Sequence, residues 1–301
     1  MMLNKIPTGI KTFDININDG FPAGSVILLL EDIGAGAREF IYTSIFNISK
    51  LKSDNHAEFM KRYKSNDTDD IVTVPVLPGK VCYMSVSRSL EDILKENAYA
   101  FRKDFYNSLQ GVIFKDFSDM YFRHSIVHDL SQDIWAEHKK DNKNENKKEN
   151  IGVNSIDSSG SNSGKKILEE ISRFLGKNAE NNIVVLDSLT DLMLYDDMNK
   201  TDIIMFLKGL VRMSKVWNGI IYIILGADIL DNKMQEIIKD NVDGVLVFEW
   251  YDKGSDKMRR NLYMSKFKGL IPRLEQNKIA KFETKVTYDN GFEVSNVRKI
   301  I

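Results

Sequence analysis

The sequence has little of what several classes of protein require. Its single cysteine, Cys82, excludes an internal disulfide and lies in an apolar run, which is typical of a packing residue in a reducing compartment. No apolar stretch approaches the roughly 20 residues that a membrane-spanning helix needs. The opening MMLNKIPTGI lacks the apolar core of a signal peptide. These absences predict a cytoplasmic protein with no membrane insertion.

The net charge also indicates no particular class of partner. The 42 Lys and Arg residues nearly balance 43 Asp and Glu residues, and the net charge is −1. This balance excludes a global attraction to nucleic acids or to anionic membranes, although it leaves a local basic patch open. The 43% hydrophobic and 28% charged content is ordinary for a globular protein.

Short apolar runs alternate with amphipathic helical patterns along most of the chain. This alternation predicts an α/β fold with a mostly parallel central sheet and helices on both faces. The sequence after Trp250 alternates polar and apolar residues, which predicts an antiparallel C-terminal extension. Asp289-Asn290-Gly291 predicts a turn within it. The expected parallel strands are Ser25–Leu30, Lys80–Ser85, Ile183–Leu186, Ile220–Leu225 and Val245–Phe248, and two apolar helical stripes fall at 167–175 and 203–213.

Two segments break this pattern. Residues 139–165 are low in complexity and nearly devoid of apolar side chains, so they cannot bury enough surface to offset the entropy of ordering. They predict a disordered surface insertion, and residues 51–70 predict a second, polar insertion. We interpret residues 1–301 as a single domain that carries both.

The segment GSVILLLEDIGAGAREFIY, residues 24–42, contains the most informative motif. It predicts a buried strand, a tight loop with Gly34 and Gly36, and then a helix, a layout that directs backbone N–H groups and a helix dipole at a phosphate. The active motif is G-x-x-x-x-G-K-[ST]. Aligned on Gly36, the first glycine is Glu31, the lysine is Ala37 and the hydroxyl residue is Arg38. Three of the four defining positions have changed, which predicts a degenerate Walker A loop.

Four signals in order along the chain resemble those of KaiC-like proteins of the RecA superfamily of P-loop ATPases, with the look of an archaeal-type paralogue. IPTGIKTFDININDGFPAGSVILL resembles the family's opening, and IVVLDSLTDLM resembles its second nucleotide motif, ending its apolar run at Asp187. LYMSKFKGL is similar to the late strand with a K-x-R pair, in which Lys266 matches and Lys268 stands for the arginine. KFETKVTYDNGFEV resembles the closing hairpin. The resemblance implies a RecA-like P-loop NTPase fold.

The resemblance also implies which catalytic parts are missing. The family's ATPases need the loop lysine, the loop hydroxyl, a magnesium-linked aspartate and a glutamate that activates water. Only the aspartate, Asp187, is present. The paired glutamates of the family fall on Ser87 and Arg88, neither of which is a general base near neutral pH without further activation. We therefore expect no catalytic residue and no metal site.

Residual binding stays open at this stage. The two loop glycines and Arg38 are candidates for holding an anion such as ATP weakly, with or without magnesium. Alternatively, the loop is an inherited turn and Arg38 pairs with Glu31 or Asp32. Asp187 likewise either contacts a nucleotide, or bonds the loop or Arg38 in a structural role.

The late strand adds two further alternatives. In the family, residues at the positions of Lys266 and Lys268 reach a nucleotide held by a neighbouring subunit, whereas here they are equally consistent with a solvated strand face. Together with Arg259 and Arg260, the two lysines form a candidate basic patch for DNA or RNA, although no aromatic stacking pattern accompanies it.

The leading functional hypothesis is a KaiC-like pseudo-ATPase, a regulatory or assembly component that does not hydrolyse nucleotide and works with a protein partner or by self-association. The first alternative is an ATP-binding protein or slow ATPase. The second is a DNA-associated accessory protein related to recombinase paralogues.

Overall fold

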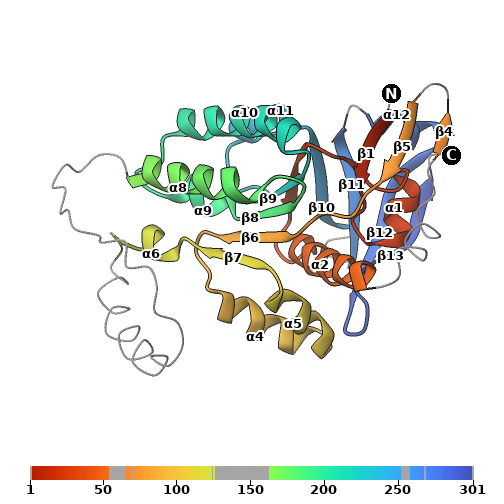
Figure 1. The fold of residues 1–301 in the computed structure, drawn as a ribbon, viewed down its shortest axis with the longest axis horizontal. Coiled ribbons are helices and arrows are strands. Elements are labelled where there is room, and N and C mark those ends of the chain that lie inside the picture. The colour runs from red at the N-terminus through yellow and green to blue at the C-terminus, as the bar shows by residue number, and fades with distance from the viewer. Residues whose placement is uncertain are drawn as a thin grey trace.

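The computed structural model describes residues 2–53, 66–68, 71–123, 125, 163–251, 258–267 and 269–299. In these residues the chain forms a large sheet with helices on both faces and a smaller sheet beside it (Figure 1). The predicted α/β class, the mostly parallel central sheet and the antiparallel C-terminal extension are all confirmed.

The large sheet has the strand order β13-β12-β11-β10-β3-β9-β8-β6-β7 in the described part of the chain. Neighbours from β10 to β7 run parallel, and those from β10 to β13 run antiparallel. All five expected parallel strands are present, and the short, partly buried β7 was not expected. The strands are β3 (Ser25–Glu31), β6 (Val81–Ser85), β7 (Ile113–Asp116), β8 (Ile183–Asp187), β9 (Ile220–Gly226), β10 (Gly244–Tyr251), β11 (Arg259–Phe267), β12 (Ile279–Thr287) and β13 (Gly291–Lys299).

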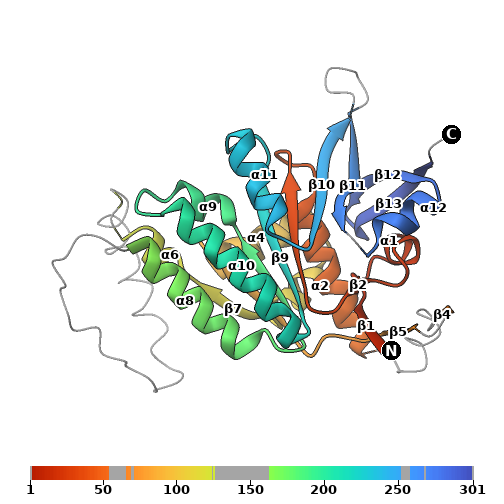
Figure 2. The same cartoon turned by 90° about the horizontal axis from the view of Figure 1, so that it is seen from above.

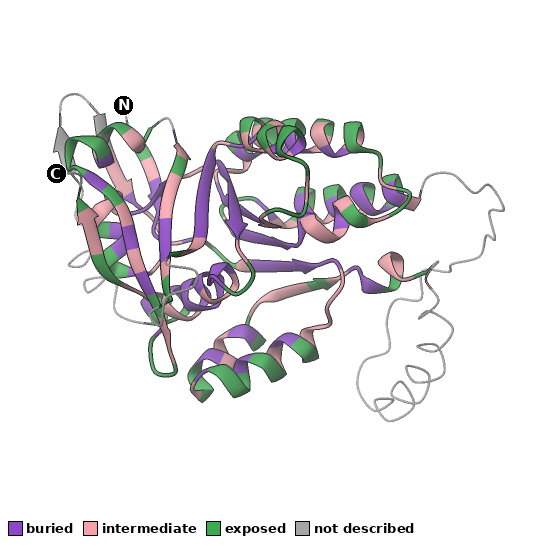
Figure 3. Cartoon of the chain, turned by 180° about the vertical axis from the view of Figure 1, so that it is seen from behind, coloured by how far each residue is buried: buried purple, intermediate pink, exposed green. Residues whose placement is uncertain are grey.

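The central strands are buried on both faces because a helical layer covers each side of the sheet. Every residue of β3 and β8 is buried, which explains why these strands are continuous apolar runs rather than alternating ones. Figure 3 shows this burial along the middle of the sheet, with exposed residues on the outer sides of the helices.

The helices divide between the two faces. Helices α8, α9, α10 and α11 pack on one core layer, and α1, α2, α4 and α5 pack on the other (Figure 2). The two predicted apolar stripes lie in α8 and α10. The helices are α1 (Lys11–Asn16), α2 (Ala37–Ser53), α4 (Leu90–Ala100), α5 (Lys103–Gln110), α6 (Ser118–Tyr121), α8 (Ser163–Asn178), α9 (Leu189–Leu194), α10 (Lys200–Trp217), α11 (Asn232–Asp240) and α12 (Ile271–Gln276).

The C-terminal extension closes over the start of α2. Strands β12 and β13 form a hairpin whose turn reaches Gly291 at φ +69°, where the sequence predicted a turn. The Phe292 ring lies 5.5 Å from the Phe40 ring and 5.8 Å from the Phe248 ring, edge to face in the first case. The hairpin is therefore part of the core and not a separate unit.

The smaller sheet contains the N-terminal strand and part of the expected polar insertion. Its strands follow the order β2-β1-β5-β4, with β1 (Met2–Ile6), β2 (Phe21–Pro22), β4 (Asn66–Thr68) and β5 (Ile71–Pro75). Residues 51–53 of that insertion end α2, and residues 54–65 and 69–70 lie outside the described residues.

The second expected insertion needs a boundary correction. Residues 163–165 form the first turn of α8, because the helix extends about one turn ahead of its first core side chain, Ile167. Gly164 is buried there, and a Cβ at this position would lie 2.6 Å from the carbonyl oxygen of Asp197. Residues 139–162 lie outside the described residues. Of the helices that the structure describes, none is both long and apolar enough to cross a bilayer.

Candidate functional site

The candidate site lies at the carboxyl end of β3, in the middle of the sheet. Strand β3 is flanked by β10 and β9, and the loop after it leads directly into α2. Gly34 and Gly36 have φ values of +73° and +114°, which favour glycine. A Cβ on Gly36 would also lie 3.2 Å from the Phe292 ring, so the limited space favours glycine there in addition to the backbone conformation.

At the start of α2, the place where this architecture offers backbone N–H groups to an anion is occupied by a side chain of the protein itself. The backbone N–H groups of Gly36 and Ala37 both donate to Oε1 of Glu31, each at 3.1 Å. Glu31 is only 6% exposed. Burial raises the pKa of the Glu31 carboxyl above its ordinary value, while Arg38 and the two N–H donors oppose that shift. A carboxylate thus lies where the helix dipole and the free N–H groups of this architecture favour a phosphate.

Arg38 connects this carboxylate to a second one. Its Nη2 lies 2.8 Å from Oδ1 of Asp187 and its Nε lies 3.3 Å from Oδ2, which gives a two-point contact. Its Nη1 lies 3.6 Å from Oε2 of Glu31. Asp187 is 2% exposed and ends β8, two strands from the loop. The structure therefore has two pairings that the sequence left open as separate alternatives, Arg38 with Glu31 and Arg38 with Asp187.

Tyr83 completes this network and was not identified from the sequence. Its hydroxyl donates to Oδ2 of Asp187 at 2.7 Å. Desolvation, together with the neighbouring Asp187 carboxylate, holds the pKa of Tyr83 well above its ordinary value, so this residue is a neutral donor. Nothing in the apolar run around Tyr83 distinguishes it from a packing residue. Its role depends on the parallel pairing of β6 with β8, which sets Tyr83 beside Val185 and therefore on the same face of the sheet as Asp187, two residues further along β8.

Strands β10 and β11 hold the outside of the loop. Trp250 Nε1 donates to the carbonyl of Ile33 at 2.9 Å, and Arg260 Nε donates to the carbonyl of Gly34 at 3.1 Å. The Arg260 guanidinium also lies 4.3 Å from the centre of the Trp250 ring. Arg260, considered from sequence as part of a nucleic-acid patch, is thus engaged with the loop. Arg259 lies 3.6 Å from Glu283.

The positions expected for water-activating glutamates carry no carboxylate. Arg88 forms an ion pair with Glu96 of α4. Glu91 pairs with Lys95 on the outside of the same helix at 2.7 Å. Ser89 caps α4 and accepts a hydrogen bond from the backbone N–H of Asp92. The segment after β6 is therefore used to start a helix. No group of three or more potential metal ligands occurs among the residues that the structure describes.

Lys266, the candidate contact to a neighbouring subunit, makes its hydrogen bonds within its own chain. Its Nζ donates to the backbone carbonyls of Lys239 and Asp240, at 2.9 and 2.7 Å. These carbonyls end α11 and have no partner inside the helix, so a lysine here satisfies them. Lys268 lies outside the described residues. The structure does not bring Lys266 to the loop of its own chain.

A pocket of about 210 Å³ borders the network. This volume is below the roughly 300–1,000 Å³ typical of ligand pockets. Ile33, which is 92% exposed, and Ile229, which is 43% exposed, are among its lining residues. Thr190 also lines it and accepts a hydrogen bond from the Gly226 N–H at 2.8 Å. The pocket is an accessible space beside the loop rather than a preformed nucleotide cavity.

This strand order, with a glycine loop joining a central strand to a helix, defines the RecA-like fold of P-loop ATPases. Two solved structures share this fold. One is a KaiC-like protein from the hyperthermophilic archaeon Pyrococcus horikoshii OT3, which is 16% identical, with a TM-score of 0.59 over 98% of this chain and 100% of that chain. The other is the flagellar accessory protein FlaH from Methanocaldococcus jannaschii, which is 13% identical, with a TM-score of 0.55 over 96% of each chain. No protein-family model and no curated protein matches the sequence. The likeness therefore shows the fold.

Proposed function

We propose that this protein is a pseudo-ATPase, a RecA-fold regulatory or assembly component that does not hydrolyse nucleotide. One observation carries the proposal: the Glu31 carboxylate accepts the two N–H groups that a P-loop offers to phosphate. A triphosphate would have to displace this carboxylate and would then lie beside its negative charge. The network of Glu31, Arg38 and Asp187 supplies internally the charges that nucleotide and magnesium supply in an active site.

The missing groups support the same proposal. Ala37 is fully buried where the motif has its lysine, and Arg38 occupies the hydroxyl position and is committed to Asp187. Neither Ser87 nor Arg88 can act as a general base without further activation. Weak binding of ATP remains the runner-up, because the strand, loop and helix retain their geometry.

The proposal also includes a protein partner or a second copy of this chain. FlaH is described as an accessory protein, and a chain with the same fold, whose loop N–H groups are already bonded to its own Glu31, suits a comparable accessory role in a larger assembly. The rim residues Ile33 and Ile229 expose apolar surface next to the loop, which supports binding of a protein partner or of a second copy there. The free, buried Cys82 supports a cytoplasmic location.

The test is thermal unfolding of the wild-type protein with and without about 1 mM Mg-ATP. We expect an affinity weaker than about 10 μM. The unfolding free energy should therefore rise by less than the roughly 2.7 kcal/mol that a ligand at 100 times its Kd provides. A rise of several degrees that Arg38→Ala abolishes would replace the proposal with the ATP-binding alternative. Salt-sensitive binding of an oligonucleotide would favour the DNA-associated alternative.

A reconstruction separates lost binding from lost catalysis. The triple variant Glu31→Gly, Ala37→Lys, Arg38→Thr removes the carboxylate that accepts the loop N–H groups and restores the lysine and the hydroxyl. It should bind Mg-ATP more tightly than the wild type. Phosphate release should stay at background until Ser87→Glu is added, since general-base assistance contributes about 10²–10⁴-fold. Ser87→Gln in the same background is the matched control. Steady turnover by the wild type or by the triple variant would show that the protein is an enzyme.

A further inference from the structure

The pocket of about 210 Å³ beside the glycine loop has apolar walls. Ile33 and Ile229 line it as exposed side chains, and the buried Ile224 lines it from β9. Because Ile33 is 92% exposed, it contributes little to the core, and its apolar surface is open to another molecule. The pocket is smaller than a typical ligand site, but it has room for one long side chain.

The charge of this pocket is negative. Glu31 and Asp191 line it as carboxylates, and Arg38 is the one cation among its described lining residues. The charge of Arg38 is offset by Asp187, whose Oδ1 lies 2.8 Å from Nη2. Three carboxylates therefore surround one guanidinium, and even with Glu31 protonated the carboxylates outnumber the cation.

Asp191 is available to a donor from outside. It lies half-buried in the first turn of α9. Its Oδ2 accepts a hydrogen bond from the hydroxyl of Ser188 at 2.6 Å, whereas its Oδ1 has no hydrogen bond within the described residues. Asp191 also makes no ion pair with any residue that the structure describes. Asp228, directly before Ile229 in the chain, is exposed and adds a further negative charge at the rim.

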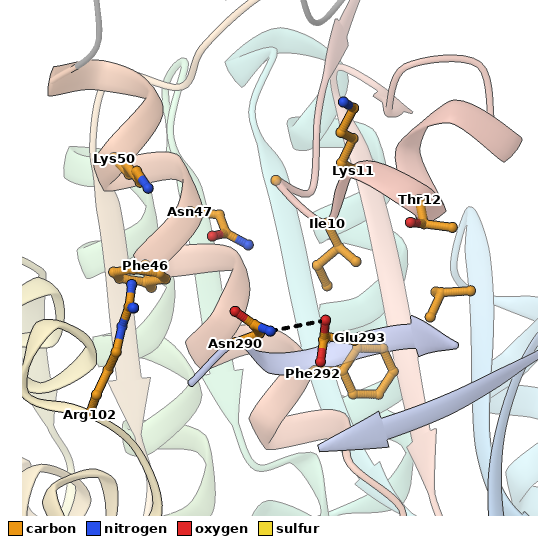
Figure 4. Close-up of a pocket in the computed structure, with 12 residues that line it drawn as sticks. Ile10, Lys11, Thr12, Phe46, Asn47, Lys50, Arg102, Asn290, Phe292 and Glu293 are labelled. Carbon is orange, nitrogen blue, oxygen red and sulfur yellow. Dashed lines mark hydrogen bonds between the residues drawn. The ribbon is translucent and has the colours of Figure 1, made fainter. Parts of the chain in front are cut away.

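A larger pocket, of about 310 Å³, has a carboxylate in the opposite condition (Figure 4). Glu293, the one carboxylate among its described lining residues, accepts hydrogen bonds from Thr287 at 3.1 Å and from Asn290 at 3.3 Å. It also lies 3.5 Å from Nζ of Lys285. This carboxylate is satisfied by its own hairpin, so Glu293 is a matched comparison for Asp191.

We propose that the pocket beside the loop receives a lysine or arginine side chain from a basic segment of a partner protein. The aliphatic stem of such a side chain packs on the isoleucines while its charged end reaches a carboxylate. The negative charge of the pocket repels nucleic acids and anionic lipids, which favours a protein partner. This inference rests on the proposed function, because it takes the pocket to be free of nucleotide and specifies the chemistry of the partner proposed there.

The experiment is fluorescence anisotropy of a labelled, amidated peptide of alternating leucine and lysine, titrated with the full chain at low salt. An otherwise identical peptide with glutamate in place of lysine is the charge control. We expect saturable binding of the lysine peptide that weakens as salt is added, and no binding of the glutamate peptide. Asp191→Asn and Ile33→Ser should each weaken binding by about tenfold.

Two control variants match these substitutions. Glu293→Gln removes a pocket carboxylate that is already paired. Val216→Ser removes an apolar side chain that is 71% exposed near the end of α10. Both should bind the lysine peptide like the wild type. Asp191→Asn keeps an oxygen for the Ser188 hydroxyl and Ile33 is exposed, so both test variants should fold, which circular dichroism checks.

The absence of saturable binding of the lysine peptide would overturn the inference, as would equal binding of the glutamate peptide or equal weakening by Glu293→Gln. A concentration-dependent mass in light scattering that Asp191→Asn abolishes would overturn it too, because a second copy of the chain would then fill the pocket.

Addition of about 1 mM Mg-ATP separates this inference from the proposed function. We expect the bound lysine peptide to stay in place. Its displacement would contradict the proposed function, because nucleotide would then occupy the site, while the binding of the basic segment in the absence of nucleotide would still support the inference.

Discussion

The hydrogen bonds between Glu31 and the loop predict opposite results for two substitutions at that position. Glu31→Gln keeps an oxygen that can accept the Gly36 and Ala37 N–H groups, whereas Glu31→Ala leaves both donors without an acceptor from the protein. The alanine variant should therefore lose stability and gain a vacant anion site. The glutamine variant should do neither, which makes it the matched control.

The magnitudes follow from the contacts. A hydrogen bond to a charged group contributes about 1.5–3 kcal/mol net, but the adjacent space of about 210 Å³ lets water reach the freed N–H groups. We therefore expect Glu31→Ala to reduce the unfolding free energy by about 1–3 kcal/mol. Glu31→Gln loses only the attraction to Arg38 across 3.6 Å and removes a buried charge. Its change should stay within about 1 kcal/mol.

The contribution of Glu31 to the unfolding free energy should change with pH in one direction. Because the pKa of Glu31 is raised in the folded state, its protonation favours the fold. The contribution is complete below the ordinary glutamate pKa and is lost as the pH rises through the raised value. Relative to Glu31→Gln, the wild type should therefore become more stable as the pH falls from 7 towards 4.5. Urea unfolding at several pH values measures this difference.

Sulfate tests whether the Glu31→Ala variant has a vacant anion site at the loop. Sulfate stabilises most proteins by exclusion from their surface, so the relevant quantity is the additional stabilisation of Glu31→Ala over the wild type. At about ten times its Kd, a bound anion adds about 1.4 kcal/mol. Glu31→Gln should gain no more than the wild type. If Glu31→Ala is as stable as the wild type and gains nothing extra from sulfate, Glu31 does not occupy the anion position.

Three further outcomes are expected. Tyr83→Phe should cost about 1 kcal/mol in urea unfolding, because Asp187 loses a buried hydrogen bond; an unchanged midpoint would place Tyr83 outside the network. Lys266→Ala should lower stability by about 1 kcal/mol through the end of α11 while leaving the mass measured by light scattering unchanged; a changed mass would restore the intersubunit role. Replacing residues 139–162 with a short Gly/Ser linker should leave the unfolding midpoint within a few degrees, and loss of folded protein would contradict that.

The site was only partly predictable from the sequence. Alignment on Gly36 is enough to identify the substitutions at Glu31, Ala37 and Arg38, and it left an acidic partner for Arg38 as one of two open alternatives. Which acid it pairs with, and at what distance, depends on β3 and β8 lying two strands apart, with β9 between them. The use of Glu31 as the acceptor of its own loop requires the backbone path from Glu31 to Ala37, which no residue pattern specifies.

The sequence by itself determined the class of fold, five of the parallel strands in their order along the chain, the helix after the glycine loop and the two helices that carry the apolar stripes, whereas β7 was not expected. Hydrophobic periodicity carries that information because it reports which faces are buried, and Gly34 and Gly36 indicate a tight loop whose positive φ values favour glycine. Tertiary structure alone decided that Tyr83 donates to Asp187 and that Lys266 donates to the last carbonyls of α11. It also decided that Arg260 and Trp250 donate to carbonyls of the glycine loop. These are contacts between residues from 26 to 226 positions apart. Their partners are chosen by strand pairing and by the direction of each side chain, and those exist only once the sheet has assembled.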